Sequence, residues 1–200
     1  MKLPLVSALL VLCAAGALTL SSASSQGESE NAMAEMMAKA ERWTKPGEHH
    51  KLLEKFVGKW NTEVRMFMGG QATPPEKGTA ECTWLMPGRW IQCRSNGQMM
   101  RMPMETFFLM GYDNFKMSYV TTALNSMDTM MLHFEGDMTP DGKSLVSYGT
   151  LDEYLTGEHD KMVKTAWRFI DADTMVFEVH DLPIGEVNAK VFEIKYMRSK

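Results

Sequence analysis

Methionine gives this sequence its most conspicuous chemistry, because a thioether sulfur is a ligand that Cu(I) prefers. The chain has 20 methionines among 200 residues, and five of them fall in the single stretch GQMMRMPMETFFLM. Met66 and Met68 repeat the alternate spacing of Met100, Met102 and Met104, so these thioethers could surround one copper ion. The same spacing puts the three later methionines on one face of a β-strand. We favour this second interpretation, in which the methionines are flexible apolar fillers of a barrel wall, and expect no metal.

The five histidines offer the remaining metal and haem chemistry. His50 and Glu54 lie four positions apart, a spacing that metals use. Two ligands do not make a site, so an exposed pair on a helix is the simpler interpretation. His180, at the end of a predicted strand, is the one histidine that could point inward. We expect no cofactor, and keep copper or haem binding as alternatives.

Catalytic motifs are not found in the sequence. It has no G-x-S-x-G, no H-E-x-x-H, no phosphate-binding loop and no dinucleotide fingerprint. A turn of Tyr112, Asp113 and Asn114 beside a pocket could do acid–base work. Asp and Asn are also the residues that a tight turn requires, and we favour the turn. We expect that the protein is not an enzyme.

Two cysteines flank the turn dipeptide Pro87-Gly88, which separates two β-rich runs. If that dipeptide centres a hairpin, Cys82 and Cys93 stand opposite each other, roughly 4.5–5.5 Å apart at Cα, and a disulfide can span that distance. Two free, half-buried thiols are the alternative, because the pair would occupy a hydrogen-bonded position, the less comfortable one for a bridge.

Residues 1–23 have the pattern of a signal peptide. Lys2 precedes the apolar run LPLVSALLVLCAAGALTL, and small residues follow that suit cleavage after Ala23. A transmembrane anchor is the competing interpretation, against which Pro4 and the polar SSQGESEN argue. We expect an exported protein, periplasmic or extracellular, with no stable membrane anchor. The formal net charge of −4 also argues against a nucleic-acid partner.

Residues 24–45 predict a polar tether followed by an amphipathic helix. Its apolar residues Met33, Met36, Met37 and Trp43 recur at helical spacing, and the stripe either packs on the domain that follows or binds a partner. The helix is expected to stop before the breaker TKPGE. A second short helix, GEHHKLLEKFVG, then leads into the first strand.

Residues 46–200 predict one all-β domain with short turns between its strands. Ten strands are expected, at 59–68, 78–85, 90–96, 99–110, 116–123, 127–135, 143–150, 161–170, 174–180 and 187–197. Short connections make strands that follow each other pair as antiparallel neighbours. Ten such strands remove their edges by closing, so the pattern predicts an up-and-down barrel.

The strand at 99–110 places methionines, Thr106 and Phe108 on one nearly apolar face. Pro103 cannot donate to the ladder, so we expect an irregularity there. The residues expected to line the barrel and contact a ligand are Trp60, Met66, Met100, Met102, Phe108 and Trp167.

The run LLEKFVGKWNTEV contains a G-x-W signature, Gly58 and Trp60, with which proteins of the calycin group begin. Residues 46–198 resemble the DUF1579 family of uncharacterised proteins. The likeness rests on this signature and on the runs PGEHHKLLEKFVGKW, MPGRWIQC, GQMMRMPMETFFLMGYDN, NSMDTMMLHFEG and FEIKYMR. The chain departs from the family pattern at Pro87, where Gly is usual, and at 104–106, which read Met-Glu-Thr in place of Phe-Glu-Gly. The resemblance implies a calycin-like barrel and no known activity.

Methionine-rich walls adapt their shape and suit varied apolar ligands. We therefore expect a protein that binds a small, mainly apolar molecule inside the barrel. A structural or interaction protein with a filled barrel is the alternative. The sequence gives no signal for the oligomeric state.

Overall fold

The structure, a computed structural model, describes residues 23–153, 156–182 and 189–200, with side chains from residue 29 onward. The predicted signal peptide therefore lies, except for Ala23, outside the described residues. The two helices are α1 (Ala23–Thr44) and the 3-10 helix η1 (Glu48–Lys55). The strands are β1 (Gly58–Met68), β2 (Gln71–Ala72), β3 (Glu76–Met86), β4 (Trp90–Met99), β5 (Met102–Asp113), β6 (Ser118–Asn125), β7 (Leu132–Met138), β8 (Ser144–Glu153), β9 (Glu158–Phe169), β10 (Thr174–Asp181) and β11 (Ala189–Arg198). Neither helix, within these residues, is long and apolar enough to cross a bilayer.

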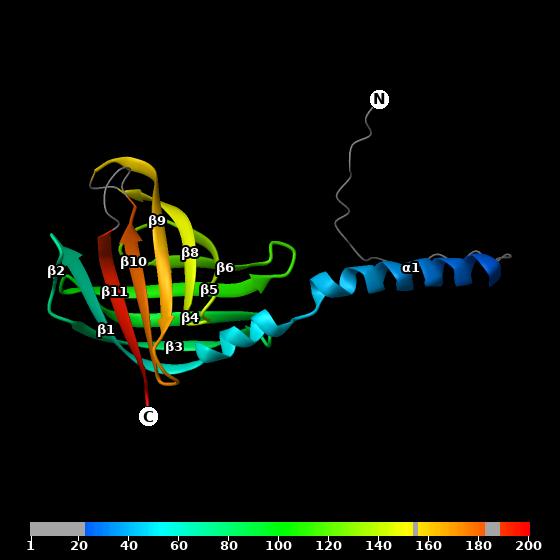
Figure 1. The fold of residues 1–200 in the computed structure, drawn as a ribbon, viewed down its shortest axis with the longest axis horizontal. Coiled ribbons are helices and arrows are strands. Elements are labelled where there is room, and N and C mark those ends of the chain that lie inside the picture. The colour runs from blue at the N-terminus through cyan, green and yellow to red at the C-terminus, as the bar shows by residue number, and fades with distance from the viewer. Residues whose placement is uncertain (1–22, 154–155, 183–188) are drawn as a thin grey trace. The chain divides into compact units, whose positions relative to one another are not determined.

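The ten long strands form a closed antiparallel barrel. Each pairs with its neighbour in sequence order, and β11 returns to pair with β1, from Trp60 opposite Arg198 to Met66 opposite Phe192. In Figure 1 the red β11 lies between β1 and β10, where it closes the wall. The two-residue β2 pairs only with the end of β1, opposite Phe67 and Met68. The predicted up-and-down, calycin-like barrel of about ten strands is confirmed.

Side chains alternate between the interior and the outer face of the wall, as the period of a β-strand requires. In β9, Val163, Thr165 and Trp167 are buried, whereas Met162 and Lys164, on either side of Val163, are more exposed. The same alternation runs along the other long strands and builds one aromatic-rich core inside the barrel.

The turn between β4 and β5 lies further along the chain than predicted. Residues 97–98, between the two strands expected at 90–96 and 99–110, continue β4, and Gly97 pairs with Met104. The chain reverses at Met100 and Arg101, both with left-handed backbone (φ 54° and 63°), and the Arg101 N–H donates to Glu76 Oε1 over 2.9 Å. The placement of Met100 and Met102 on the inner wall is therefore wrong. Met100 lies in the turn and Met102 begins β5, with exposed fractions of 60% and 46%.

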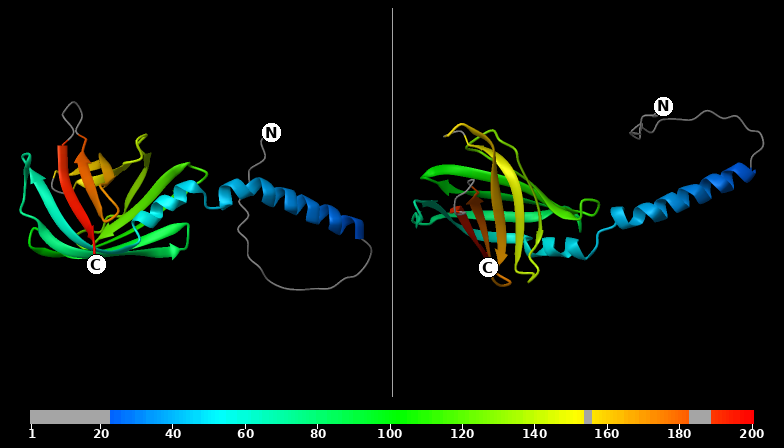
Figure 2. Two further views of the ribbon diagram at one scale, coloured as in Figure 1. Left: turned by 60° about the horizontal axis from the view of Figure 1, so that its bottom comes forward. Right: turned by 45° about the horizontal axis from the view of Figure 1, so that its top comes forward.

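The chain divides into two compact units, residues 1–41 and 42–200. Helix α1 begins at Ala23, so residues expected to form a tether are helical; the Ala, Glu and Met that follow are strong helix formers, and they extend the helix. In the second unit, η1 covers one end of the barrel, and both appear together in Figure 2. Its Leu53 and the adjoining Phe56 are fully buried.

Candidate functional site

An apolar cavity of about 320 Å³ occupies the interior of the barrel. Its walls come from β4 to β11, and its only charged lining side chain among the described residues is Asp128. The lining residues are Met99, Met104, Thr106, Phe107, Phe108, Thr121, Ala123, Leu124, Asn125, Met127, Asp128, Met130, Leu132, Phe134, Ser147, Leu151, Val163, Thr165, Trp167, Phe177, Val179, Phe192, Ile194 and Tyr196. Its size is at the lower end of the range for small-molecule sites, about 300–1,000 Å³.

Among the described residues, the cavity extends to the end of the barrel away from η1. The half-exposed Met127, Asp128 and Met130, from the loop between β6 and β7, stand at this end. Asp128 shapes the loop, because its carboxylate accepts hydrogen bonds from Asn125 Nδ2 (2.7 Å) and the Met130 N–H (2.9 Å). We call this the open end.

The other end of the barrel, which we call the closed end, is sealed by η1 and the residues around it. Phe56 packs edge-on against Trp167 and Phe169, with ring centroids 5.0 and 5.6 Å apart. The Trp60 Nε1–H donates to the Phe56 carbonyl over 2.8 Å. The Tyr119 hydroxyl donates to the His49 carbonyl, also over 2.8 Å. These contacts fix η1 as a plug.

The G-x-W signature has a structural role at the closed end. Gly58 has a φ of +139°, and the guanidinium of Arg198 lies where a side chain would project. That guanidinium stacks 4.2 Å from the centroid of the Trp60 ring, and its Nη1 donates to the Val57 carbonyl over 2.9 Å. The signature thus joins the first strand to the last one.

His50 is buried at the closed end, which contradicts its prediction as an exposed residue. Its Nδ1 accepts a hydrogen bond from the Gly47 N–H over 3.0 Å. Burial, together with the positive charge of Arg89 and the neighbouring His49, lowers the pKa of His50 below its ordinary value. The imidazole is therefore neutral near pH 7 and serves as a cap of η1.

The turn that joins β5 to β6 also holds the closed end. Asp113 Oδ1 accepts hydrogen bonds from the backbone N–H groups of Phe115 (2.8 Å) and Lys116 (3.1 Å). Asn114 Nδ2 donates to the carbonyl of Lys45 over 2.7 Å. The motif GYDN thus acts as a turn and a clamp on the segment before η1, which gives its carboxylate a structural role.

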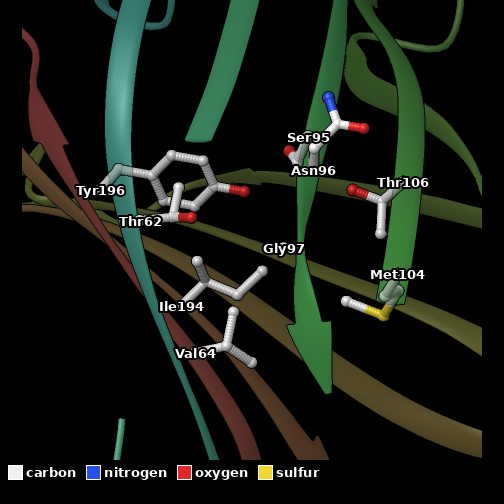
Figure 3. A pocket seen from close by; sticks show the side chains of 9 residues that line it. All are labelled: Thr62, Val64, Ser95, Asn96, Gly97, Met104, Thr106, Ile194 and Tyr196. Atoms are coloured by element: carbon white, nitrogen blue, oxygen red, sulfur yellow. The ribbon is translucent and has the colours of Figure 1, made fainter. Parts of the chain in front are cut away.

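A small polar chamber adjoins the apolar cavity, between β1, β4, β5 and β11. It measures about 10 Å³ and shares Met104, Thr106, Ile194 and Tyr196 with the larger cavity. Figure 3 shows the hydroxyls of Thr62, Ser95, Thr106 and Tyr196 pointing toward one another across it. We call these four side chains the hydroxyl cluster.

Two members of the hydroxyl cluster have unusual environments. Burial raises the pKa of Tyr196 above its ordinary value, and the Ser95 hydroxyl nearby opposes only part of this rise. The two hydroxyls nevertheless lack hydrogen-bond geometry, so the buried Ser95 Oγ has no hydrogen-bond partner within the described residues. The phenol stays protonated at neutral pH, and the serine oxygen is available to another group.

The structure brings only some of the predicted ligand-binding residues to the cavity. Phe108 and Trp167 line it. Trp60 is buried toward the closed end, outside the lining, and Met66 is half-buried further along β1, also outside it. Met100 and Met102, which lie exposed at the β4–β5 turn, do not line the cavity either. Contact of Phe108 and Trp167 with a ligand stays a prediction.

His180, the one histidine that the sequence allowed to point inward, faces outward. Phe177 and Val179 of β10 line the cavity, so Glu178 and His180 alternate to the outer face. His180 Nε2 lies 3.2 Å from the Glu178 carboxylate, which also accepts a hydrogen bond from Arg168 Nη2 over 3.0 Å. This removes the interior histidine on which the haem alternative depended.

Metal clusters of three or more His, Cys, Asp or Glu side chains are not found within the described ranges. Methionine is not among the side chains of this comparison, so copper binding by thioethers stays an alternative for experiment. The exposed positions of Met100 and Met102 exclude the wall interpretation for these two residues without implying a metal.

Cys82 and Cys93 lie opposite each other on β3 and β4, with their Cα atoms 4.0 Å apart, and their sulfurs are joined as a disulfide. Both side chains are buried in the core. The strand register is the one expected of a hairpin turning near Pro87 and Gly88. The disulfide would fasten the wall beside the hydroxyl cluster, because Ser95 lies on the same strand as Cys93.

Sequence reasoning missed the hydroxyl cluster as a group. Thr62 lies between Trp60 and Val64 on the inner face of β1, so its inward direction could be read from alternation. Ser95 lies in the predicted strand 90–96, but the direction of its side chain was not predicted. Met127 and Met130 were expected in the strand 127–135, but β7 begins at Leu132, and both residues lie in the loop before it.

Comparisons with known proteins agree with this architecture. The S-type phycobiliprotein lyase CPES from Guillardia theta is similar in structure at 11% sequence identity, with a TM-score of 0.51 over 80% of this chain and 96% of that one. Rv2717c from M. tuberculosis is similar at 11% identity, with a TM-score of 0.52 over 78% of this chain and all of that one (100%). Both likenesses concern the fold alone.

A search of curated proteins finds no sequence that matches this chain. The family model for DUF1579, described as protein of unknown function, matches residues 45–198. This span covers the segment before η1, the plug and the whole barrel, and it includes the turn and clamp residues of the closed end. The chain therefore belongs to the DUF1579 family.

Proposed function

We propose that this protein binds a small, mainly apolar molecule inside the barrel. The observation that carries the proposal is the cavity of about 320 Å³, which is lined mainly by apolar and aromatic side chains. Apolar surface buried against such walls stabilises a complex by about 25 cal/mol per Å² before ordering costs.

The division between the two ends of the barrel supports the proposal. The closed end is sealed by η1, so a molecule would enter and leave at the open end. A barrel filled by its own side chains, the structural alternative, needs no such interior space. The likeness to a phycobiliprotein lyase supports the fold alone at 11% identity, so it supplies no substrate.

Binding can be tested with a pair of substitutions on one strand. Ala123 of β6 lines the cavity, so Ala123→Phe would fill part of it. Thr122, its neighbour, alternates to the outer face, and Thr122→Phe is the matched control. Native mass spectrometry and displacement of the neutral dye Nile red would follow binding, with circular dichroism as the check of folding.

The expected result is binding of apolar probes by the wild type and by Thr122→Phe, with a loss of at least tenfold in Ala123→Phe. Absence of binding across an apolar panel by the folded wild type would contradict the proposal. Equal binding by the two variants would place any bound molecule outside the cavity.

We propose further that the protein is exported, and that it is not an enzyme. Export rests on the signal-like pattern of residues 1–23 and on cysteines placed to form a disulfide. Cell fractionation and sequencing of the mature N-terminus test this, and a mature chain beginning at Ser24 is expected. Retention of Met1 in a cytosolic protein would contradict it.

A further inference from the structure

The hydroxyl cluster gives the apolar cavity one polar corner. The Ser95 Oγ is buried there without a hydrogen-bond partner in the described chain. Buried polar groups are nearly always satisfied by protein, water or ligand, and an unsatisfied one costs about 1–3 kcal/mol. The chamber of about 10 Å³ has room for about one oxygen atom with its hydrogens.

The backbone keeps this corner open. Gly78 of β3 is the residue paired with Thr62, and a Cβ at Gly78 would lie 2.8 Å from Thr62 Oγ1 and 3.0 Å from the Gly97 Cα. Glycine at this position therefore leaves β1 and β4 close together, without a side chain of β3 between the hydroxyls. The space is built by the fold.

The charges around the cavity select against an anion. Among the residues described as lining the cavity and the chamber there is no Lys, Arg or His, and the single charged group is Asp128. A buried anionic head group would lack a cationic partner, and an unpaired buried charge is far more costly than a neutral hydrogen-bonding group. A neutral oxygen can accept a hydrogen bond from a tyrosine and exchange one with a serine.

We propose that the ligand is an apolar molecule that carries one neutral oxygen, a hydroxyl or carbonyl, and that the hydroxyl cluster binds this oxygen. The inference rests on the proposed function and names the chemical class of molecule for that cavity. Tyr196 and Ser95 make the hydrogen bonds, while Phe108 and Trp167 contact the apolar body.

Three probes of equal chain length, decane, decanol and decanoate, distinguish a purely apolar ligand from one with a neutral oxygen and from an anion. Each competes against Nile red at pH 8. Tyr196→Phe keeps the buried ring and removes only the hydroxyl. Ser95→Ala removes the unpartnered oxygen. Thr121→Val removes a hydroxyl elsewhere in the cavity, outside the chamber, and is the matched control.

The expected result is that Tyr196→Phe weakens decanol binding about tenfold, the effect of one hydrogen bond, and changes decane binding less than twofold. Ser95→Ala should weaken decanol binding without lowering Tm, because it removes an unsatisfied buried group. Thr121→Val should leave both ligands unchanged. Wild-type protein should bind decanol at least tenfold more tightly than decanoate.

Equal changes for decane and decanol in Tyr196→Phe would overturn the inference and leave the proposed function intact, with the chamber assigned to a buried water. Tighter binding of decanoate than of decanol would also overturn it. Failure of all three probes and of Nile red to bind the folded wild type would overturn the proposed function, and this inference with it.

Discussion

The two ends of the barrel are built from different kinds of residues. At the closed end, rings pack edge to edge and nearly every polar atom that we describe has a specified partner: Trp60 with Phe56, Tyr119 with His49, and Arg198 with Val57. At the open end the exposed large side chains include Met68, Met100, Met102 and Met131, although Met86 and Met117, in turns of the closed end, are exposed as well. The packing against η1 is therefore what distinguishes the closed end.

The two ends of the barrel should therefore contribute differently to the stability of the fold. A residue of the closed end contributes to the free energy of unfolding through buried contacts. A residue near the open end already faces the cavity or solvent, so its removal loses fewer contacts. Substitutions matched across the two ends should therefore have unequal effects, and four predictions test this.

The largest effect is expected for Phe56→Ala. Phe56 is fully buried between η1 and the barrel, and Phe-to-Ala changes in a core cost about 3–5 kcal/mol. Phe107, a half-buried residue that lines the cavity, is the open-end match, and Phe107→Ala should cost about 1 kcal/mol. Urea unfolding of both variants measures the difference, and equal losses would break the contrast between the ends.

The next effect concerns alkaline pH. Burial raises the pKa of Tyr119 to about 12, whereas tyrosine in the unfolded chain ionises near pH 10. Above pH 10 the unfolded state releases a proton that the folded state keeps, so stability present at lower pH falls as pH rises through 12. Unfolding at pH 8 and pH 11 should show a smaller fall in Tyr119→Phe than in the wild type. The same fall in both proteins would assign the alkaline loss to other groups.

A moderate effect is expected at the β5–β6 turn. Asp113→Ala removes the acceptor of two backbone hydrogen bonds, and should lower the free energy of unfolding by about 1 kcal/mol. Asp113→Asn keeps an oxygen at that position and should cost less. Thermal unfolding of the two variants provides the measurement. An unchanged Tm in Asp113→Ala would show that the carboxylate does not hold the turn.

The smallest effect is expected for the methionines. Met-to-Leu changes at Met100 and Met102 should alter stability by less than about 0.5 kcal/mol each, because both are exposed, and at Met104 by less than about 1.5 kcal/mol. Purified protein should hold no stoichiometric copper. Anaerobic Cu(I) titration of the wild type and the triple leucine variant is the measurement, and tight binding lost in the variant would make these methionines ligands.

Strand positions could be predicted because each strand has a run of alternating residues bounded by turn formers. The ten expected segments all overlap a long strand, and the sequence order of pairing follows from short connections. The β4–β5 turn could not be predicted in this way, because Met100 and Arg101 adopt left-handed conformations that Gly or Asn normally favours. Its position depends on Glu76, which is distant in sequence.

The candidate site was predictable only in part for a related reason. Inward direction follows from alternation, which placed Phe108 and Trp167 correctly on the inner face. Depth along the barrel axis does not follow from alternation, because it depends on which end η1 fills. Trp60 was therefore expected at the ligand and is found near the plug. His50 was assigned to the surface because its burial depends on packing against β5.

The pairing of β1 with β11 has a consequence for how the protein is made. The first long strand finds its second neighbour only in β11, far along the chain, since Trp60 pairs with Arg198. Contacts so distant in sequence form slowly, because a long loop must close first. During synthesis β1 keeps an unpaired edge until β11 has left the ribosome. A chain that ends before β11 would expose that edge and the edge of β10 for good, and exposed edges pair with other molecules.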